Sequence, residues 1–299
     1  MFSTFAMMFG SLLNIIYNFV HNYGIAIILF TIIIKLAMLP ITINQQKSMK
    51  KNAKVQEKMK VLQVKYKGDK EKLNQEVMAM YKEEKMNPMS GCLSAIIQMV
   101  LMISIFYMIR NPLTYMQNMD SEKIDHYIQQ LEYNDKYVST AYRETDIIRE
   151  SAFLIKENPD DPDVERTNLN MNFLGLDLNR VPNQNLTDWT VYIIPVIYII
   201  STFISIRITT MYQTKKKEKN KLLVEDNNKN AEKPAEPTSM EQMNKTMMWM
   251  MPIMSISISM IAPLGLALYW LTNNILMICE RLVLNKVLKD EDKNEVEVI

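Results

Sequence analysis

The sequence predicts an all-α polytopic membrane protein with five transmembrane helices, a cytoplasmic helical hairpin and an external helical insertion. Apolar residues are concentrated in blocks of spanning length along the 299 residues. The segments between the blocks differ in charge: residues 42–90 hold twelve lysines against six acids, whereas residues 110–188 hold fifteen acidic residues against eight basic ones. Because basic loops stay in the cytoplasm, we expect the first segment inside and the second outside. The net charge of +1 conceals this asymmetry.

Residues 1–22 are uncharged, and their apolar side chains recur at helical spacing. We expect them to form an amphipathic helix that lies in the membrane interface. They lack the basic start and small-residue cleavage site of a signal peptide, and the sequence has no lipobox cysteine.

Residues 23–43 are the first predicted span, because a bilayer core of about 30 Å requires about 20 apolar residues in a helix. Lys35 is the single charge in this span. At about 1.5 Å per residue it lies on the order of 12 Å from Ile43, so its side chain does not easily reach the interface. Lysines at such depth face a partner or a water-filled cavity. We favour a solvated groove, because no other span carries a carboxylate near its middle. Glu280 lies near the inner end of the last apolar run. A structural ion pair is the alternative.

Residues 44–90 predict a cytoplasmic coiled-coil hairpin, because apolar residues step by three and four on both sides of a turn at Gly68. Its lysines fit a solvated face, and they also fit contacts with anionic lipid or ribosomal RNA. Residues 91–109 are the second span, in which Gln98 is the only amide at depth.

The rest of the chain follows the same alternation of apolar and charged segments. Trp189 is an interfacial anchor for the third span, and Pro263 separates the last two spans. The predicted segments are an external insertion (110–188), the third span (189–212), a cytoplasmic linker (213–245), the fourth span (246–262), the fifth span (264–284) and a charged cytoplasmic tail (285–299).

The residues that covalent chemistry needs are missing. The two cysteines have no CxxC or Cys/His spacing, so zinc, haem and disulfide sites are not expected. No GxSxG, HExxH, GxGxxG or GxxxxGK[ST] motif occurs. We therefore expect neither an enzyme nor a nucleotide-driven pump, no metal or other cofactor, and no DNA partner.

Three predicted spans carry polar side chains four residues apart, which places each pair on one helix face. The pairs are Thr31 and Lys35, Ser201 and Ser205, and Trp270 and Asn274. Such stripes indicate a hydrophilic groove, and the alternative is ordinary hydrogen bonding between membrane helices.

Four stretches resemble the core of the YidC membrane protein insertases, in order, over about two-thirds of the chain. They are YGIAIILFTIIIKLAMLPIT, EVMAMYKEEKMNPMSGCLSAIIQM, NFLGLDL and PLGLALYWLTNNILMICE. With no large outer domain after its first residues, the sequence is most similar to the Gram-positive bacterial type. The resemblance implies five helices around a groove that opens to the cytoplasm and lipid and is closed outside. A nascent membrane protein would rest its polar flank there while its apolar span slides into the lipid bilayer.

The resemblance also assigns site residues. Lys35 matches the family's groove arginine, Thr31 its substrate-facing threonine, and Trp270 the aromatic residue of its LYW run. Lys35 would attract acidic residues of the incoming flank. Ser205 and Glu280 stand where some members have glutamine.

We expect Gln98 and Asn274 to complete the groove. A Sec-type translocon and a ribosome on the basic hairpin are partners that the sequence leaves open. The alternative function is a small-solute transporter or channel with Lys35 as an anion site, although no internal repeat relates the five spans.

Overall fold

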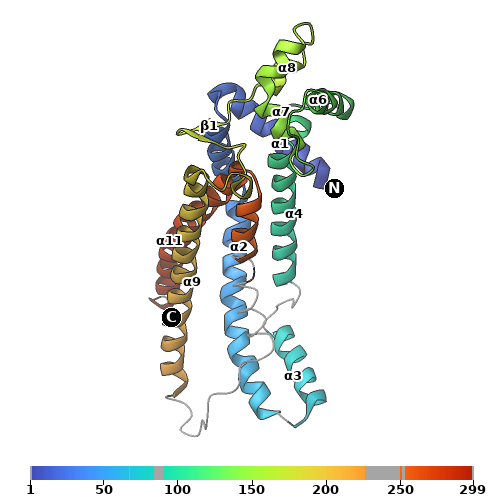
Figure 1. The fold of residues 1–299 in the computed structure, drawn as a ribbon. Coiled ribbons are helices and arrows are strands. Elements are labelled where there is room, and N and C mark those ends of the chain that lie inside the picture. The colour runs from blue at the N-terminus through green and yellow to red at the C-terminus, as the bar shows by residue number, and fades with distance from the viewer. Residues whose placement is uncertain (1, 67, 84–89, 226–249, 251–252, 298–299) are drawn as a thin grey trace. The chain divides into compact units, whose positions relative to one another are not determined.

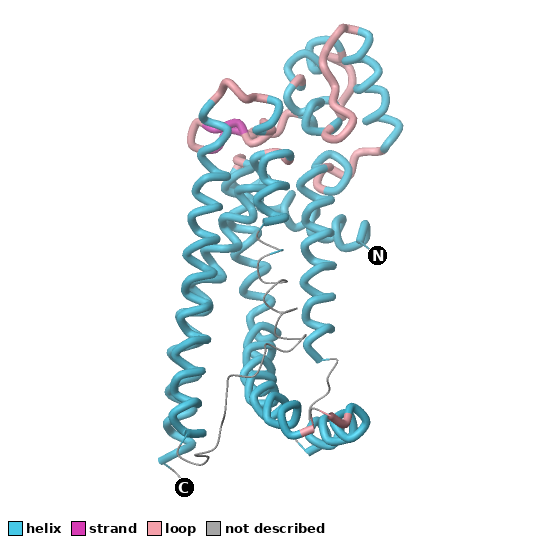
Figure 2. The backbone as a smooth tube through the Cα atoms, turned by 60° about the horizontal axis from the view of Figure 1, so that its bottom comes forward, coloured by secondary structure: helices cyan, strands magenta, loops and turns pink. Residues whose placement is uncertain are grey.

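A computed structural model describes residues 2–66, 68–83, 90–225, 250 and 253–297, and it confirms the all-α class. Within these residues the strands are confined to one short antiparallel pair (Figure 2). The elements are α1 (Phe2–Val20), α2 (Tyr23–Lys65), α3 (Lys70–Glu83), α4 (Ser90–Arg110), α5 (Pro112–Tyr115), α6 (Ser121–Tyr133), α7 (Arg143–Arg149), α8 (Ser151–Glu157), η1 (Val164–Thr167), β1 (Asn172–Phe173), β2 (Leu176–Asp177), η2 (Pro182–Gln184), η3 (Trp189–Tyr192), α9 (Ile193–Glu225) and α11 (Leu264–Glu297) (Figure 1). A further helix covers residues 253–261.

Within the described residues, three helical stretches are long and apolar enough to cross a membrane: Phe2–Val20, Tyr23–Gln45 and Trp189–Ile208. A shorter apolar helix covers Ile96–Arg110. These stretches are those of a membrane protein. The interfacial placement of the N-terminal helix stays a prediction, because α1 has the length and composition of a span as well.

Three helices, α2, α9 and α11, are longer than the spans predicted within them, and α11 continues through the predicted tail as far as Glu297. The first predicted span and the first arm of the hairpin form one helix, α2, which passes through Pro40. Residues 44–54 contain neither glycine nor proline, so nothing in them ends the helix. Likewise α9 continues into the predicted linker as far as Glu225, because its lysine- and glutamate-rich continuation consists of good helix formers. The rest of the linker, residues 226–245, lies outside the described residues.

The chain divides into two compact units. One comprises Met1–Leu36, Met99–Phe203 and Met254–Ile299, and the other comprises Ala37–Gln98 and Ile204–Ile253. The hydrophobic core of the first unit takes buried side chains from α1, α2, α4, the 110–188 segment, α9 and α11.

The second unit holds a small apolar cluster between the end of α2 and α3. Val55, Met59 and Met80 are buried in it, as their heptad-like spacing predicts. The Asp69 side chain accepts a hydrogen bond of 2.9 Å from the Lys72 amide and so caps the start of α3. The predicted end of the hairpin, residues 84–89, lies outside the described residues.

A close backbone contact holds α1 against the 110–188 segment. A Cβ atom at Gly10 would lie 2.0 Å from the carbonyl oxygen of Tyr115 in α5. The buried Glu144 carboxylate of α7 in turn accepts hydrogen bonds from the amide and hydroxyl of Thr114 in α5, at 3.0 and 2.6 Å. Burial raises the pKa of Glu144. Helices α1, α5 and α7 are therefore joined at two successive contacts.

The contact at Gly10 predicts the effect of one added methyl group. Gly10→Ala should lower the free energy of unfolding by about 1–3 kcal/mol, because the helices must move apart to admit it. Thermal melting in detergent measures the change. Gly68→Ala is the matched control, because no atom lies within 4 Å of its added Cβ. Equal melting temperatures for the Gly10 variant and the wild type would contradict the contact.

An ion-pair cluster binds α6 to the loop after α8. The Lys123 ammonium donates to both carboxylate oxygens of Asp161 at 2.7 Å, and the Tyr127 hydroxyl donates to the same carboxylate at 2.8 Å. The hydrogen bond from Lys123 is the main cause that lowers the pKa of Asp161. A carboxylate with a lowered pKa stabilises the fold above its ordinary pKa and loses that contribution as the pH falls through its folded value.

The lowered pKa of Asp161 predicts how the stability of one variant depends on pH. Lys123→Gln should lower the melting temperature at neutral pH, and the difference from the wild type should shrink as the pH falls below about 4. Melting curves across that range test it. Arg143→Gln, which breaks the exposed pair with Asp125, should change little at any pH. If the difference in melting temperature between Lys123→Gln and the wild type stays constant with pH, the charge of Asp161 does not contribute to stability.

Candidate functional site

The segment of residues 170–180 covers the first turns of two long helices of the first unit, α2 and α11 (Figure 1). The first amides of a helix have no partner within it, and here they donate to carbonyl oxygens of this segment. The bonds are Tyr23 to Asn170 (3.0 Å), Leu264 to Arg180 (2.9 Å) and Gly265 to Leu178 (3.1 Å). The Tyr23 and Ile27 side chains also lie against Gly265. The two helices therefore start side by side.

Deeper along these helices, Lys35 of α2 forms an ion pair with Glu280 of α11. Lys35 Nζ lies 3.6 Å from Glu280 Oε2, which is beyond hydrogen-bond length. The exposed fractions of the two side chains are 25% and 11%. The other oxygen of Glu280 is buried and has no hydrogen-bond partner within the described part of the chain. The structure thus pairs Lys35 with a carboxylate, which the sequence left as the alternative, and the solvated groove around Lys35 stays a prediction.

The shared starting level of the helices explains why this pair forms. Lys35 is twelve residues from Tyr23 and Glu280 is sixteen from Leu264, which at 1.5 Å per residue gives depths of about 18 and 24 Å. Two long side chains bridge a difference of about 6 Å. The sequence placed Glu280 near the end of its predicted span, but it did not show that Lys35 reaches the level of Glu280.

The packing around both helices opens at this depth. Residues 264–271 of α11 are all buried, whereas residues 275–280 are half-buried or exposed. On α2, Phe30 and Thr31 are buried, and none of residues 32–36 is. The first part of α11 is thus enclosed by the core, whereas the first part of α2 buries one face and exposes Ile25 and Leu29. The ion pair lies where burial falls on both helices.

Thr31 does not face an open groove. Its side chain is 2% exposed, and its hydroxyl donates to the carbonyl of Ile27 in its own helix at 2.6 Å. The residue therefore belongs to the closed part of the bundle, one turn before Lys35.

Trp270 also lies in the closed part. Its ring is buried and stacks on Tyr198 of α9, with 6.0 Å between the ring centroids. The Tyr198 hydroxyl in turn donates to the hydroxyl of Ser255 in the helix of residues 253–261, at 2.8 Å. Through Tyr198, Trp270 of α11 is thus linked to α9 and to the helix of residues 253–261.

Asn274, one turn after Trp270, forms a buried hydrogen-bond network with α9. Its amide nitrogen donates to the Ser201 hydroxyl at 2.9 Å and to the Thr202 hydroxyl at 3.2 Å. Both hydroxyls donate to the carbonyl of Tyr198. For Ser201 and Asn274, the structure shows hydrogen bonding between helices, which the sequence left as the alternative to a groove.

The remaining two candidates belong to the second unit. Ser205 is buried on α9, and Gln98 is exposed on α4. Sequence reasoning missed Tyr198, Thr202 and Ser255, because one hydroxyl in an apolar run gives no signal until its partner helix is known.

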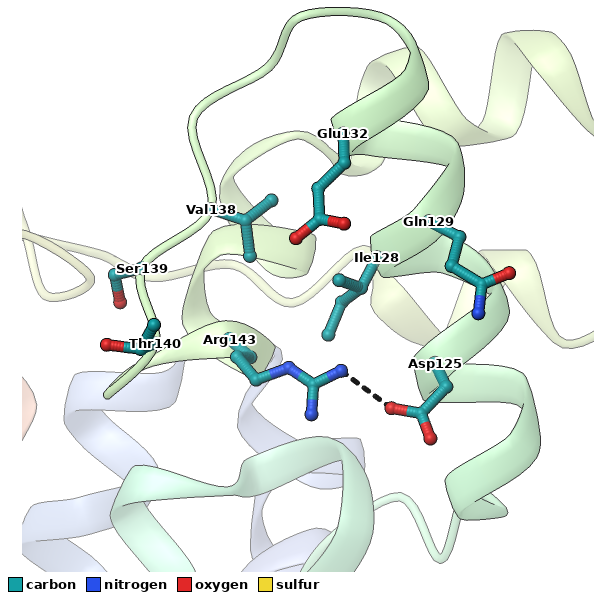
Figure 3. A pocket seen from close by; sticks show the side chains of 8 residues that line it. All are labelled: Asp125, Ile128, Gln129, Glu132, Val138, Ser139, Thr140 and Arg143. Carbon is teal, nitrogen blue, oxygen red and sulfur yellow. Dashed lines mark hydrogen bonds and ion pairs between the residues drawn. The ribbon is translucent and has the colours of Figure 1, made fainter.

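A separate cavity of about 450 Å³ lies in the 110–188 segment (Figure 3). Two of its lining side chains, Arg143 and Asp125, form an ion pair 2.6 Å long (Figure 3). The cavity is lined by Asp125, Ile128, Gln129, Glu132, Val138, Ser139, Thr140 and Arg143. Within the described residues, no group of three or more acidic, histidine or cysteine side chains could hold a metal ion.

Comparison with known proteins decides the family. The family model described as 60Kd inner membrane protein matches residues 15–292, which include both units and the ion pair. This chain belongs to that family.

Curated relatives in the family carry the name membrane protein insertase YidC. The Syntrophus aciditrophicus protein is 45% identical over 128 residues, which are 43% of this chain and 23% of the relative. For the Caldanaerobacter subterraneus protein the values are 42% over 108 residues, 36% of this chain and 52% of the relative. The Citrifermentans bemidjiense protein is 27% identical over 278 residues, which are 93% of this chain and 36% of the relative. The matches thus span at most about half of these relatives.

The buried network at Asn274 predicts a cost on its removal. Asn274→Ala should lower the free energy of unfolding by about 0.6–1.7 kcal/mol, the range for hydrogen bonds between membrane helices. A double-mutant cycle with Ser201→Ala, measured by melting, should show coupling. Thr272→Ala is the control, because its hydroxyl bonds only within α11, to Leu268. Additive effects of the Asn274 and Ser201 substitutions would contradict the bond.

Proposed function

We propose that this chain is a membrane protein insertase and chaperone, which passes short polar flanks of nascent membrane proteins through a hydrophilic groove. One observation carries the proposal: α11 is enclosed by the core at its start, α2 buries one face beside it, and the burial of both helices falls at the level of a charged pair. A bundle that is closed at one end and open at the other can admit a polar flank from one side without becoming a pore. Membership of the family and the printed name of its relatives support the same function.

The groove lowers the barrier that a polar segment meets in lipid. Each unsatisfied backbone group in hydrocarbon costs several kcal/mol, and an ionised side chain costs more. A half-open, charged site removes part of that cost for a short flank. The apolar span of the substrate then moves into lipid, and this burial stabilises it by about 0.8 kcal/mol per CH₂ group. The process needs no covalent step and no cofactor.

We propose the five-span arrangement for this function, with spans at 23–43, 91–109, 189–212, 246–262 and 264–284. Basic residues 42–90 would face the cytoplasm and acidic residues 110–188 the outside, as their charges favour.

Ser205 and Gln98, which belong to the second unit, stay candidates for further polar groups of the groove. Thr31, Trp270 and Asn274 close its outer end. Nascent membrane proteins and the lipid bilayer are the proposed partners. A Sec-type translocon and a ribosome on the basic hairpin are further candidates.

The rival function is an anion transporter or channel that uses Lys35 as its binding site. Glu280 counts against it, because the carboxylate already neutralises this lysine. Liposomes that contain only the purified chain separate the two functions. We expect them to insert a single-span protein, measured by protease protection of its flank, and to show no iodide flux. Iodide flux without insertion would establish the rival.

Substitution of Lys35 tests its place in the groove. Lys35→Arg should preserve insertion in these liposomes, because a cation remains opposite Glu280. Lys35→Ala should reduce insertion and lower the melting temperature, since Glu280 loses its partner. The stability loss should be smaller than the roughly 3–5 kcal/mol of a fully buried pair, because part of Lys35 is exposed. Wild-type insertion and stability in Lys35→Ala would remove Lys35 from the proposed site.

A further inference from the structure

We infer that Glu280 is a built-in counter-ion of Lys35, and that it sets how strongly the groove selects substrates with acidic flanks. An acidic side chain in an arriving flank must displace Glu280 before it can pair with the lysine. This inference rests on the proposed insertase function and adds a specificity-determining residue to it.

The geometry of the pair allows exchange. At 3.6 Å, the Lys35 ammonium and the Glu280 carboxylate attract each other without a hydrogen bond that fixes their orientation. The second carboxylate oxygen of Glu280 is buried and lacks a hydrogen-bond partner in the described residues. Most buried side-chain oxygens in proteins have at least one hydrogen-bond partner, and this oxygen has none among the described residues. Glu280 is therefore a loosely held partner.

The exposure of the two side chains decides which one a substrate can reach. Lys35 is 25% exposed and Glu280 is 11% exposed, so the ammonium is the more accessible of the two. A lysine ammonium is a point charge on a flexible stem with three donors, so it can turn from one carboxylate to another. Arg281 follows Glu280 on α11 and interacts electrostatically with both residues of the pair, so the displaced Glu280 keeps a cation nearby.

The charge balance gives the consequence for selection. A lone cation at this depth would attract every acidic flank strongly, because the surroundings screen charge less than water does. With Glu280 beside it, the two charges cancel at a distance, and a substrate carboxylate gains only the difference between the new pair and the old one. The pair thus lets acidic and neutral flanks use the same groove, and it keeps acidic flanks from remaining bound.

The experiment compares two substrates in liposomes that contain the purified full chain. Both have the same apolar span, and one flank position carries Asp in one substrate and Asn in the other. The measured quantity is the insertion rate of the Asp substrate divided by that of the Asn substrate. Glu280→Gln should raise this ratio about fivefold over wild type, the factor that one charge contact contributes even when screened as in water.

Two controls isolate the pair. The double variant Lys35→Gln/Glu280→Gln should remove the fivefold increase, because no cation remains to be uncovered. Glu150→Gln makes the same substitution in another lysine ion pair, where Lys136 Nζ lies 3.3 Å from Glu150 Oε2 in the 110–188 segment. It should leave the ratio at the wild-type value. Melting curves confirm that each variant is folded.

The outcomes separate this inference from the proposed function. If the wild type inserts neither substrate, the proposed function fails. If it inserts both and Glu280→Gln leaves the ratio unchanged, Glu280 is not the counter-ion that sets selection. Should Glu280→Gln fold poorly, Glu280→Asp replaces it, since a shorter carboxylate weakens the pair but keeps the charge. An intermediate increase in the ratio then supports the inference, and an unchanged ratio overturns it.

Discussion

The hydrogen bonds at the starts of α2 and α11 are the constraint on which the rest of the site depends. Both helices begin with amides that have no partner in their own helix, and both donate them to one short segment, residues 170–180. Because this segment is short, the two helices start side by side. Every later contact between them, including the pair of Lys35 and Glu280, inherits that alignment.

Beyond these starts, the bundle is closed by side chains that satisfy one another. Asn274 bonds hydroxyls of α9, and the stacked rings of Trp270 and Tyr198 join α9 to α11. In hydrocarbon such polar groups find no water, so they are stable only when paired. Residues with the spacing of a polar groove therefore lie in the closed part of the bundle. In the proposed function, the same paired groups keep the bundle from opening right through when a polar flank enters.

Among the described residues, the ion pair departs from this pattern of satisfied groups, as the buried Tyr23 hydroxyl does at the start of α2. Ion pairs are often no more stable than apolar residues in the same place, because two charges must leave water. Here one carboxylate oxygen has no partner in the described residues, and the lysine stays partly exposed. A pair that contributes little to stability and is loosely held fits a role in handling charge. In the proposed function, that charge belongs to the substrate flank.

The sequence by itself determined the class of protein and the order of its segments. Apolar blocks, the charge asymmetry between residues 42–90 and 110–188 and the heptad spacing around Val55 are local patterns, and local patterns survive in any arrangement of helices. They also located Lys35 as the charge at depth. The extension of α2, α9 and α11 beyond their spans was missed, because bilayer thickness limits the length of a span but not the length of a helix.

Tertiary structure alone decided the partners of the site residues. Whether Lys35 meets Glu280 depends on the relative height of two helices that are more than two hundred residues apart in sequence, and carbonyl groups of residues 170–180 set that height. The pairing of Asn274 with Ser201 and Thr202 depends likewise on which faces of α9 and α11 meet. A period of four residues gives the face of one helix. It does not give the neighbour of that face, because the neighbour is fixed by contacts made elsewhere in the chain.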